Sequence, residues 1–70
     1  MSTNNSADTY QGHLADGSSV QKHSVGSLYP CVLFKKYGMF GIITPSDQHG
    51  KLYDSYDLAV KAGLAWKAKH

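Results

Sequence analysis

The sequence contains no arginine and no glutamate, and Cys31 is its only cysteine. A single cysteine excludes an internal disulfide and a cluster of thiolate metal ligands, so the fold must depend on core packing. The lack of arginine removes the side chain that most often reads guanine through two hydrogen bonds. We therefore expect neither a disulfide-stabilised fold nor an arginine-based reader of nucleic acid.

Long apolar runs are also missing. A secretory signal needs a basic start followed by an apolar run, and a membrane helix needs about 18 apolar residues. Met1–Asp8 begins with neither, so we expect a cytoplasmic protein with no membrane partner. Residues 1–9 are rich in Ser, Asn and Thr and predict a flexible polar tail. Residues 10–70 are expected to form one small domain, because the chain has no mass for a second core.

The strongest pattern is a pair of short apolar runs in the middle of the chain, Leu28–Phe34 and Met39–Ile43. Such runs, joined by a segment that contains Gly38, predict a β-hairpin. Pro30 lies near the start of the first strand and Pro45 follows the second, where a missing N–H is tolerated.

The register of this hairpin depends on its turn. We predict a three-residue loop in which Gly38 takes the left-handed conformation, so that Lys35 pairs with Met39. Cross-strand neighbours then form two faces. One face carries Val32, Phe34, Phe40 and Ile42, and the other carries Cys31, Leu33, Gly41 and Ile43. Because Gly41 has no side chain, we expect another group to approach the second face closely there.

Weaker signals flank this hairpin on both sides. Asp16-Gly17 suits a tight turn between Thr9–Ala15 and Ser18–Ser24, and an irregular loop over the core is the competing interpretation. After Pro45, we expect a polar loop over Ser46–Gly50 and a short edge strand over Lys51–Tyr53.

A helix is expected to end the chain, because Asp54 or Ser55 can cap its first turn and Lys67 and Lys69 suit its last turn. At about 100° per residue, its apolar side chains form two stripes. The first stripe is Leu58, Ala62, Ala65 and Trp66, and the second is Tyr56, Val60 and Leu64. One stripe is expected to cover the sheet, and the other to meet the N-terminal segment or a second molecule. The predicted fold is therefore α+β: a small antiparallel sheet of three to five strands packed against one C-terminal helix.

No group of residues indicates catalysis, a metal or a cofactor. Ser46-Asp47-Gln48-His49 is the densest polar set, but four adjacent loop residues seldom converge on one point, and turn chemistry accounts for Pro45, Ser46 and Asp47. Cys31 lies inside an apolar run, which is typical of a core residue. The four histidines lack metal-ligand spacing and are expected at the surface or in turns; they are His13, His23, His49 and His70.

The order of elements in Lys35–Lys69 resembles the layout of plant-type AP2 DNA-binding domains. The resemblance covers half of the chain, and the residues at similar places are Tyr53, Ser55, Ala59, Ala62 and Ala65. It implies a sheet-plus-helix fold and contact with DNA through the strands. The sequence departs from that pattern, because it lacks the arginines and tryptophans that those domains place on their strands.

These observations favour a non-enzymatic protein-binding module, such as a small inhibitor or regulatory accessory protein. The chain has five tyrosines, and tyrosine is enriched at protein interfaces because it is large and amphipathic. The expected partner is another protein or a second copy of the chain. The residues expected to bind it are Tyr37, Tyr53, Tyr56, Val60 and Leu64.

The alternative is a small basic nucleic-acid-binding domain. The net charge is +2, and Lys35, Lys36 and Lys51 are expected at one end of the sheet beside Tyr37 and Tyr53. Lysines hold phosphates and tyrosines stack on bases. The remaining lysines of the C-terminal part point in three directions at helical spacing and form no basic stripe; they are Lys61, Lys67 and Lys69.

Overall fold

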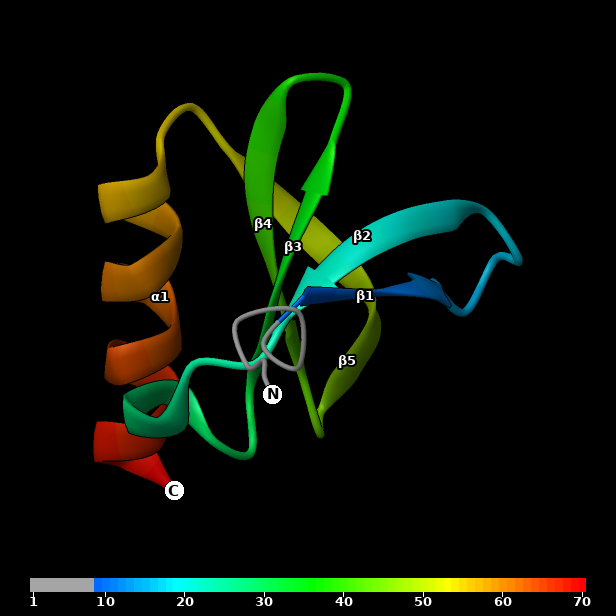
Figure 1. Cartoon of the computed structure of the whole chain (residues 1–70). Coiled ribbons are helices and arrows are strands. Elements are labelled where there is room, and N and C mark those ends of the chain that lie inside the picture. Colours follow the sequence, from blue (N-terminus) through cyan, green and yellow to red (C-terminus); the bar gives the residue numbers. More distant parts are fainter. Residues whose placement is uncertain (1–8) are drawn as a thin grey trace, which may run out of the picture.

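The computed structural model describes residues 9–70, which form one antiparallel sheet and one α-helix (Figure 1). The elements are β1 (Thr9–His13), β2 (Ser19–His23), the 3-10 helix η2 (Gly26–Leu28), β3 (Val32–Lys36), β4 (Met39–Thr44), β5 (Asp47–Tyr53) and α1 (Tyr56–Lys69). The five strands lie in the order β1-β2-β3-β4-β5. The predicted α+β class is therefore confirmed. Residues 1–8 of the predicted tail lie outside the described residues, and Thr9 begins β1.

The weak hairpin signal at Asp16-Gly17 is confirmed. Gly17 has a φ of +89°, and the Leu14 N–H donates to the Ser18 carbonyl at 2.9 Å. The Ser18 hydroxyl and N–H donate to Asp16 Oδ1 at 2.6 and 2.8 Å, which lowers the pKa of the Asp16 carboxyl below its usual value. The short polar side chain therefore closes the turn and β1 pairs with β2.

The register predicted for the β3–β4 hairpin is wrong by one residue. The turn has two residues, Tyr37 and Gly38, with φ of +55° and +74°, and Lys36 pairs with Met39. A two-residue turn of type I′ needs a positive φ at both positions, and a tyrosine rarely supplies one. Because side chains alternate along a strand, the shift exchanges partners between the faces. Leu33 now lies opposite Ile42, and Phe34 lies opposite Gly41.

The polar loop predicted over Ser46–Gly50 is also wrong, because β5 already begins at Asp47. The turn is Pro45-Ser46, and Thr44 pairs with Asp47. The first residues of β5 have polar, exposed side chains and pair through their backbones, which suits a strand at the edge of a sheet. The predicted edge strand over Lys51–Tyr53 is therefore confirmed, and it continues toward the N-terminus.

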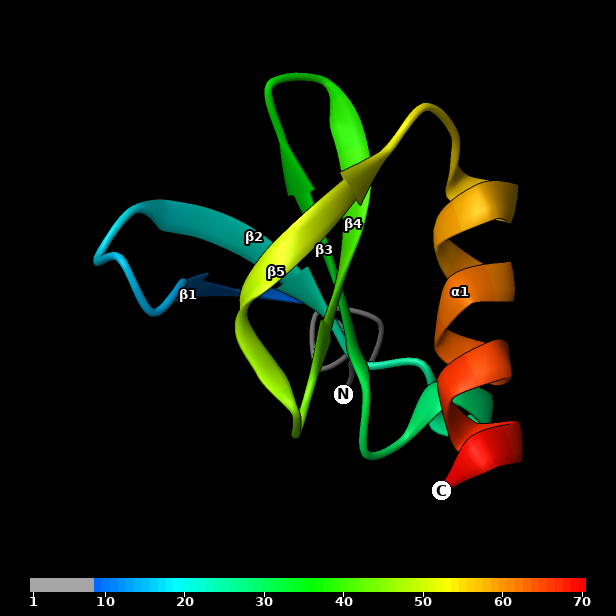
Figure 2. The same cartoon turned by 180° about the vertical axis from the view of Figure 1, so that it is seen from behind.

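The sheet is strongly curled, so that its two edges approach each other. Gly50 has a φ of +81°, and Figure 2 shows the bend in the middle of β5. Beyond the β1 strand, the Ala15 N–H donates to the Gln48 carbonyl at 3.1 Å and so ties the β1–β2 hairpin to β5. This curl creates two separate cores on the two faces of one sheet.

One core lies between the sheet and α1, and the other lies within the curl of the sheet. The helix-side core consists of Leu28, Cys31, Leu33, Ile42 and Ala59. The far-side core consists of Leu14, Val20, Phe34 and Ile43. The prediction that Cys31 is a core residue is confirmed, and burial raises the pKa of its thiol.

Helix α1 begins as predicted, since Ser55 Oγ accepts a hydrogen bond from the Leu58 N–H at 3.2 Å. The helix does not cover the sheet with either predicted stripe. Ala59 and Gly63, which lie between the stripes, are its buried residues, and Leu58 of the first stripe is 47% exposed. Small side chains let the helix approach the sheet closely, so the bulky residues flank the contact on both sides. Within residues 9–70, no helix has the length and apolar character needed to cross a membrane.

Candidate functional site

A groove of about 510 Å³ lies on the helix side of the sheet, between the first turn of α1 and strand β2. Its floor is formed by Leu33 and Phe40, and Tyr56 forms the wall on the helix side. The groove exists because α1 lies mainly over β4 and leaves the part of the sheet toward β2 uncovered. The remaining lining residues are Thr9, His23, Ser24, Val25 and Gly26.

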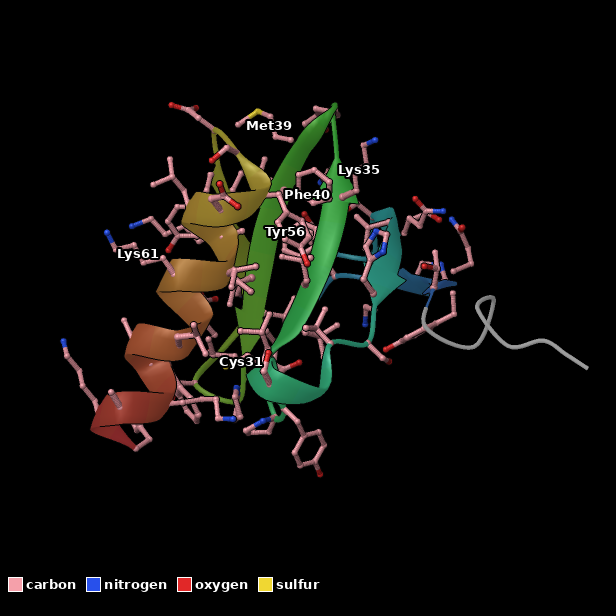
Figure 3. The ribbon with its side chains drawn as sticks, turned by 60° about the vertical axis from the view of Figure 1, so that its left-hand side comes forward. Cys31, Lys35, Met39, Phe40, Tyr56 and Lys61 are labelled. Carbon is pink, nitrogen blue, oxygen red and sulfur yellow. The ribbon has the colours of Figure 1, made fainter. Side chains whose placement is uncertain are left out.

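Three aromatic rings follow one another across the groove. The Phe40 ring packs edge-on against Tyr56, with centroids 5.3 Å apart and an interplanar angle of 87°. Its centroid lies 6.2 Å from that of the His23 ring. Figure 3 shows Phe40 and Tyr56 together between the helix and the strands, with Lys35 next to Phe40. This arrangement gives the groove aromatic surface on both its floor and one wall.

His23 also brings a polar atom to the groove. Its Nδ1 lies 3.2 Å from Thr9 Oγ1 in a hydrogen bond, whereas its buried Nε2 has no hydrogen-bond partner among residues 9–70. Buried polar atoms are almost always hydrogen-bonded, and leaving one unsatisfied costs about 1–3 kcal/mol. The interpretation of His23 as a surface or turn histidine is therefore wrong, because it is a half-buried strand residue.

The second predicted stripe of α1 runs along the helix from this groove. Tyr56 lines the groove, and Val60 and Leu64 follow at intervals of four residues, which places them on one side of a helix. Tyr56 and Leu64 remain 46% and 45% exposed. Val60 is half-buried against the helix-side core. We call Tyr56, Val60 and Leu64 the helix row.

The other two predicted anchors lie elsewhere. Tyr37 is in the β3–β4 turn, where its side chain is 81% exposed and Lys36 Nζ lies 5.0 Å from its ring centroid. Tyr53 ends β5 and is half-buried against the helix-side core. Neither residue lines the groove. The structure therefore brings three of the five predicted residues into one row and separates the other two from it.

Of the three lysines of the alternative hypothesis, Lys35 and Lys36 lie at one end of the sheet, whereas Lys51 pairs with Ile42 in the middle of β4, so the three form no single patch. Lys35 and Lys36 are adjacent in β3 and so point to opposite faces. Lys36 Nζ donates to Ser18 Oγ at 2.9 Å on one side, while Lys35 Nζ lies 5.6 Å from the Phe40 ring centroid on the other. Lys51 is two strands away from Lys35, on β5, where its Nζ lies 5.8 Å from the Tyr53 ring centroid.

The polar sets considered for catalysis do not converge. The Ser46 hydroxyl accepts a hydrogen bond from Trp66 Nε1 at 3.3 Å, and Asp47 Oδ1 accepts one from the His49 N–H at 3.1 Å. Cys31 is buried, with its Sγ 3.9 Å from the Gly63 carbonyl. A search of residues 9–70 finds no group of three or more side chains that could hold a metal ion. None of these residues lines the groove.

Most residues that line the groove were not predicted from the sequence. His23 and Thr9 belong to the weaker hairpin, and only their pairing across β1 and β2 brings them together. The predicted register sets Phe40 opposite Phe34, whereas the shorter turn pairs it with Lys35 and places it on the face that packs against the helix. A better signal was Tyr37-Gly38 itself, since a two-residue turn would have placed Leu33, Phe40 and Ile42 on one face.

Comparison of the chain with protein families, curated proteins and solved structures found no match.

Proposed function

We propose that the protein is a non-enzymatic protein-binding module of the cytoplasm, which holds a short segment of a partner against the groove and the helix row. A small inhibitor or regulatory accessory protein would act in this way. The observation that carries the proposal is the open groove, in which aromatic surface is left uncovered beside the half-exposed Tyr56 at the start of α1. A concave site with mostly apolar walls and a few polar atoms is the first candidate for a binding site in a protein.

The exposed part of the helix row supports the same conclusion. Tyr56 and Leu64 are large apolar side chains that keep almost half of their surface in water. Interface hot spots are most often large aromatic side chains at the centre of a well-packed contact. A partner that covers the groove also buries Tyr56, and it buries Leu64 if it continues along the helix row for about two further turns.

Selection of short peptides by display on the folded protein tests this proposal. We expect the selected peptides to shift backbone amide resonances of residues 23–26, 56 and 64 in the unmodified protein. Tyr56→Ala and Leu64→Ser are expected to weaken binding by about fivefold or more, as truncation of an interface anchor does. Because both side chains are half-exposed, these variants are expected to fold.

Tyr37→Asn is the matched control, since it removes an exposed tyrosine that does not line the groove. Asparagine tolerates the positive φ of this turn, so the variant keeps the hairpin. Binding is expected to change less than twofold. The proposed site is wrong if the peptides shift protein resonances away from the groove. It is also wrong if only Tyr37→Asn lowers the affinity for the peptides.

The same experiments can also reveal that the partner is a second copy of the chain. If sedimentation shows a dimer whose formation is lost in Leu64→Ser, the partner is the protein itself.

The lysine–ring pairs favour nucleic acid as a second candidate function. Three lysine ammonium groups lie 5.6, 5.0 and 5.8 Å from aromatic ring centroids, which places cations for phosphates beside rings on which bases can stack. Binding to mixed single-stranded DNA and RNA should then weaken steeply as salt rises, and Lys35→Gln and Lys51→Gln should each reduce that salt dependence. No binding at low salt would exclude this function.

A further inference from the structure

The charge around the groove restricts the chemistry of the partner. Lys35 is exposed, and its Nζ lies 5.6 Å from the centroid of the Phe40 ring that lines the groove. Among residues 9–70, none of the side chains that line the groove is acidic. Asp57 follows Tyr56 but lies about 100° further round the helix, away from the sheet. Among residues 9–70, Lys35 is therefore a charged side chain that the fold brings directly against the groove floor.

The groove also presents a polar atom that needs a partner. His23 Nε2 is buried beside the aromatic floor and has no hydrogen-bond partner within residues 9–70. A purely apolar occupant would leave this nitrogen unsatisfied, whereas an occupant with polar atoms close to an apolar group could hydrogen-bond to it if the His23 ring turns toward the groove and gives up its contact with Thr9. A segment of polypeptide has this combination at every residue.

We infer that the partner is an acidic segment of another protein, which places an aromatic or large apolar side chain against Phe40 and Tyr56 and a carboxylate beside Lys35. This inference rests on the proposed function and specifies its partner. Alternate residues of an extended chain lie about 7 Å apart on the same side. An aspartate or glutamate two residues from the anchor therefore reaches the Lys35 ammonium while the anchor contacts the Phe40 ring.

Three synthetic peptides test the inference, each with a central tryptophan and otherwise serine and glycine. The peptides differ at two positions, two residues before and two residues after the tryptophan. At both positions one peptide carries aspartate, one carries asparagine and one carries lysine. We expect all three to shift the resonances of the groove residues, and the aspartate peptide to bind about threefold more tightly than the asparagine peptide. The lysine peptide should bind most weakly, and added salt should reduce these differences because it screens exposed charges.

Lys35→Gln and Lys61→Gln form a matched pair of variants. Both lysines are exposed and both changes remove one positive charge, but Figure 3 shows Lys61 on the outward side of α1 and Lys35 next to Phe40. Lys35→Gln is expected to abolish the preference for aspartate over asparagine, and Lys61→Gln is expected to preserve it.

The possible results separate this inference from the proposed function. Equal binding of the aspartate and asparagine peptides in the groove would overturn the acidic partner and leave the binding module standing. Failure of all three peptides to shift the groove residues would count against both. If a single-stranded DNA oligonucleotide shifts the same residues, depends on Lys35 and displaces the aspartate peptide, the ligand is nucleic acid and the acidic segment is wrong.

Discussion

Gly41 allows the aromatic ring of Phe34 to lie flat on the sheet. The two residues are cross-strand partners, and Phe34 is fully buried. A β-carbon at position 41 would lie within 2.7 Å of both Phe34 Cε1 and the Lys51 carbonyl oxygen. The close approach expected at this glycine is therefore real, and the approaching group is a side chain of the same hairpin.

Replacement of Gly41 by alanine is expected to destabilise the protein by about 2–3 kcal/mol, because a ring in the centre of a core and a backbone carbonyl cannot both move away. Urea denaturation measures this free energy. Gly26→Ala is the control, since nothing lies within 4 Å of a β-carbon there, and its free energy of unfolding should stay within about 0.5 kcal/mol of the original. Similar values for the two variants would mean that the Phe34 ring moves without cost.

Cys31 gives a prediction for the dependence of stability on pH. Burial raises the pKa of its thiol, so the unfolded chain ionises at a lower pH than the folded one. The contribution of this group to stability is full below about pH 9 and is lost as pH rises through the pKa of the folded state. Urea denaturation at neutral and alkaline pH should show this loss, and Cys31→Ala should lack it. An aromatic disulfide reagent that reacts equally fast with folded and urea-unfolded protein would contradict burial of the thiol.

At the scale of elements, the packing of α1 shows why bulky residues are a poor guide to a helix face. The two predicted stripes consist of apolar side chains such as Leu58, Trp66 and Val60, and neither stripe includes Ala59 or Gly63. Ala59 and Gly63 are the helix residues buried against the sheet, because their small size lets the backbone of the helix approach it. The helix bounds followed from local capping and charge, whereas its orientation depends on the shape of the sheet.

Gly63→Ala separates helix propensity from packing. Propensity alone would stabilise the helix by about 1 kcal/mol. A β-carbon at position 63, however, would lie 3.0 Å from Leu28 Cδ2 and 3.2 Å from Ile42 Cδ1. We expect the packing cost to prevail and the free energy of unfolding to fall by about 1 kcal/mol. Ala65→Gly, at an exposed position, measures the effect of helix propensity alone and should lower the free energy of unfolding by about 1 kcal/mol. If Gly63→Ala instead raised the free energy of unfolding by that amount, α1 would be able to move away from the sheet.

The strands illustrate the same limit of local signals. The β3–β4 hairpin followed from two short apolar runs and the β1–β2 hairpin from the turn residues Asp16-Gly17, and both hairpins form. The register of β3 and β4 depended on one residue, Tyr37, which adopts a positive φ that its side chain does not favour. That single turn decides which side chains face the helix, and therefore whether Phe40 lies in the groove.

At the scale of the whole molecule, two small cores share the central strands. Leu33 and Ile42 contribute to the helix-side core, whereas Phe34 and Ile43 contribute to the far-side core. The far-side core depends on the curl of the sheet, which brings Leu14 from the first hairpin over the Phe34 ring and is fixed by the contact of Ala15 with Gln48. Contacts between residues so distant in sequence have no local signal, so the far-side core could not be predicted.

The sharing of strands predicts that the two cores unfold together. A chain of this length has a free energy of unfolding of roughly 4–10 kcal/mol, which is too small to divide between independent units.

Leu14→Ala removes a side chain of the far-side core and should cost about 2–3 kcal/mol, or a decrease in Tm of roughly 10 °C or more. Trp66, the only tryptophan, lies on α1 and packs against the helix-side core, so its fluorescence reports on the opposite face of the sheet. We expect fluorescence and far-UV circular dichroism to show the same lowered midpoint, while Leu64→Ala, at a half-exposed position, leaves both nearly unchanged. An unchanged midpoint for Trp66 in Leu14→Ala would show that the helix stays docked on β3 and β4 after the curled hairpin has opened.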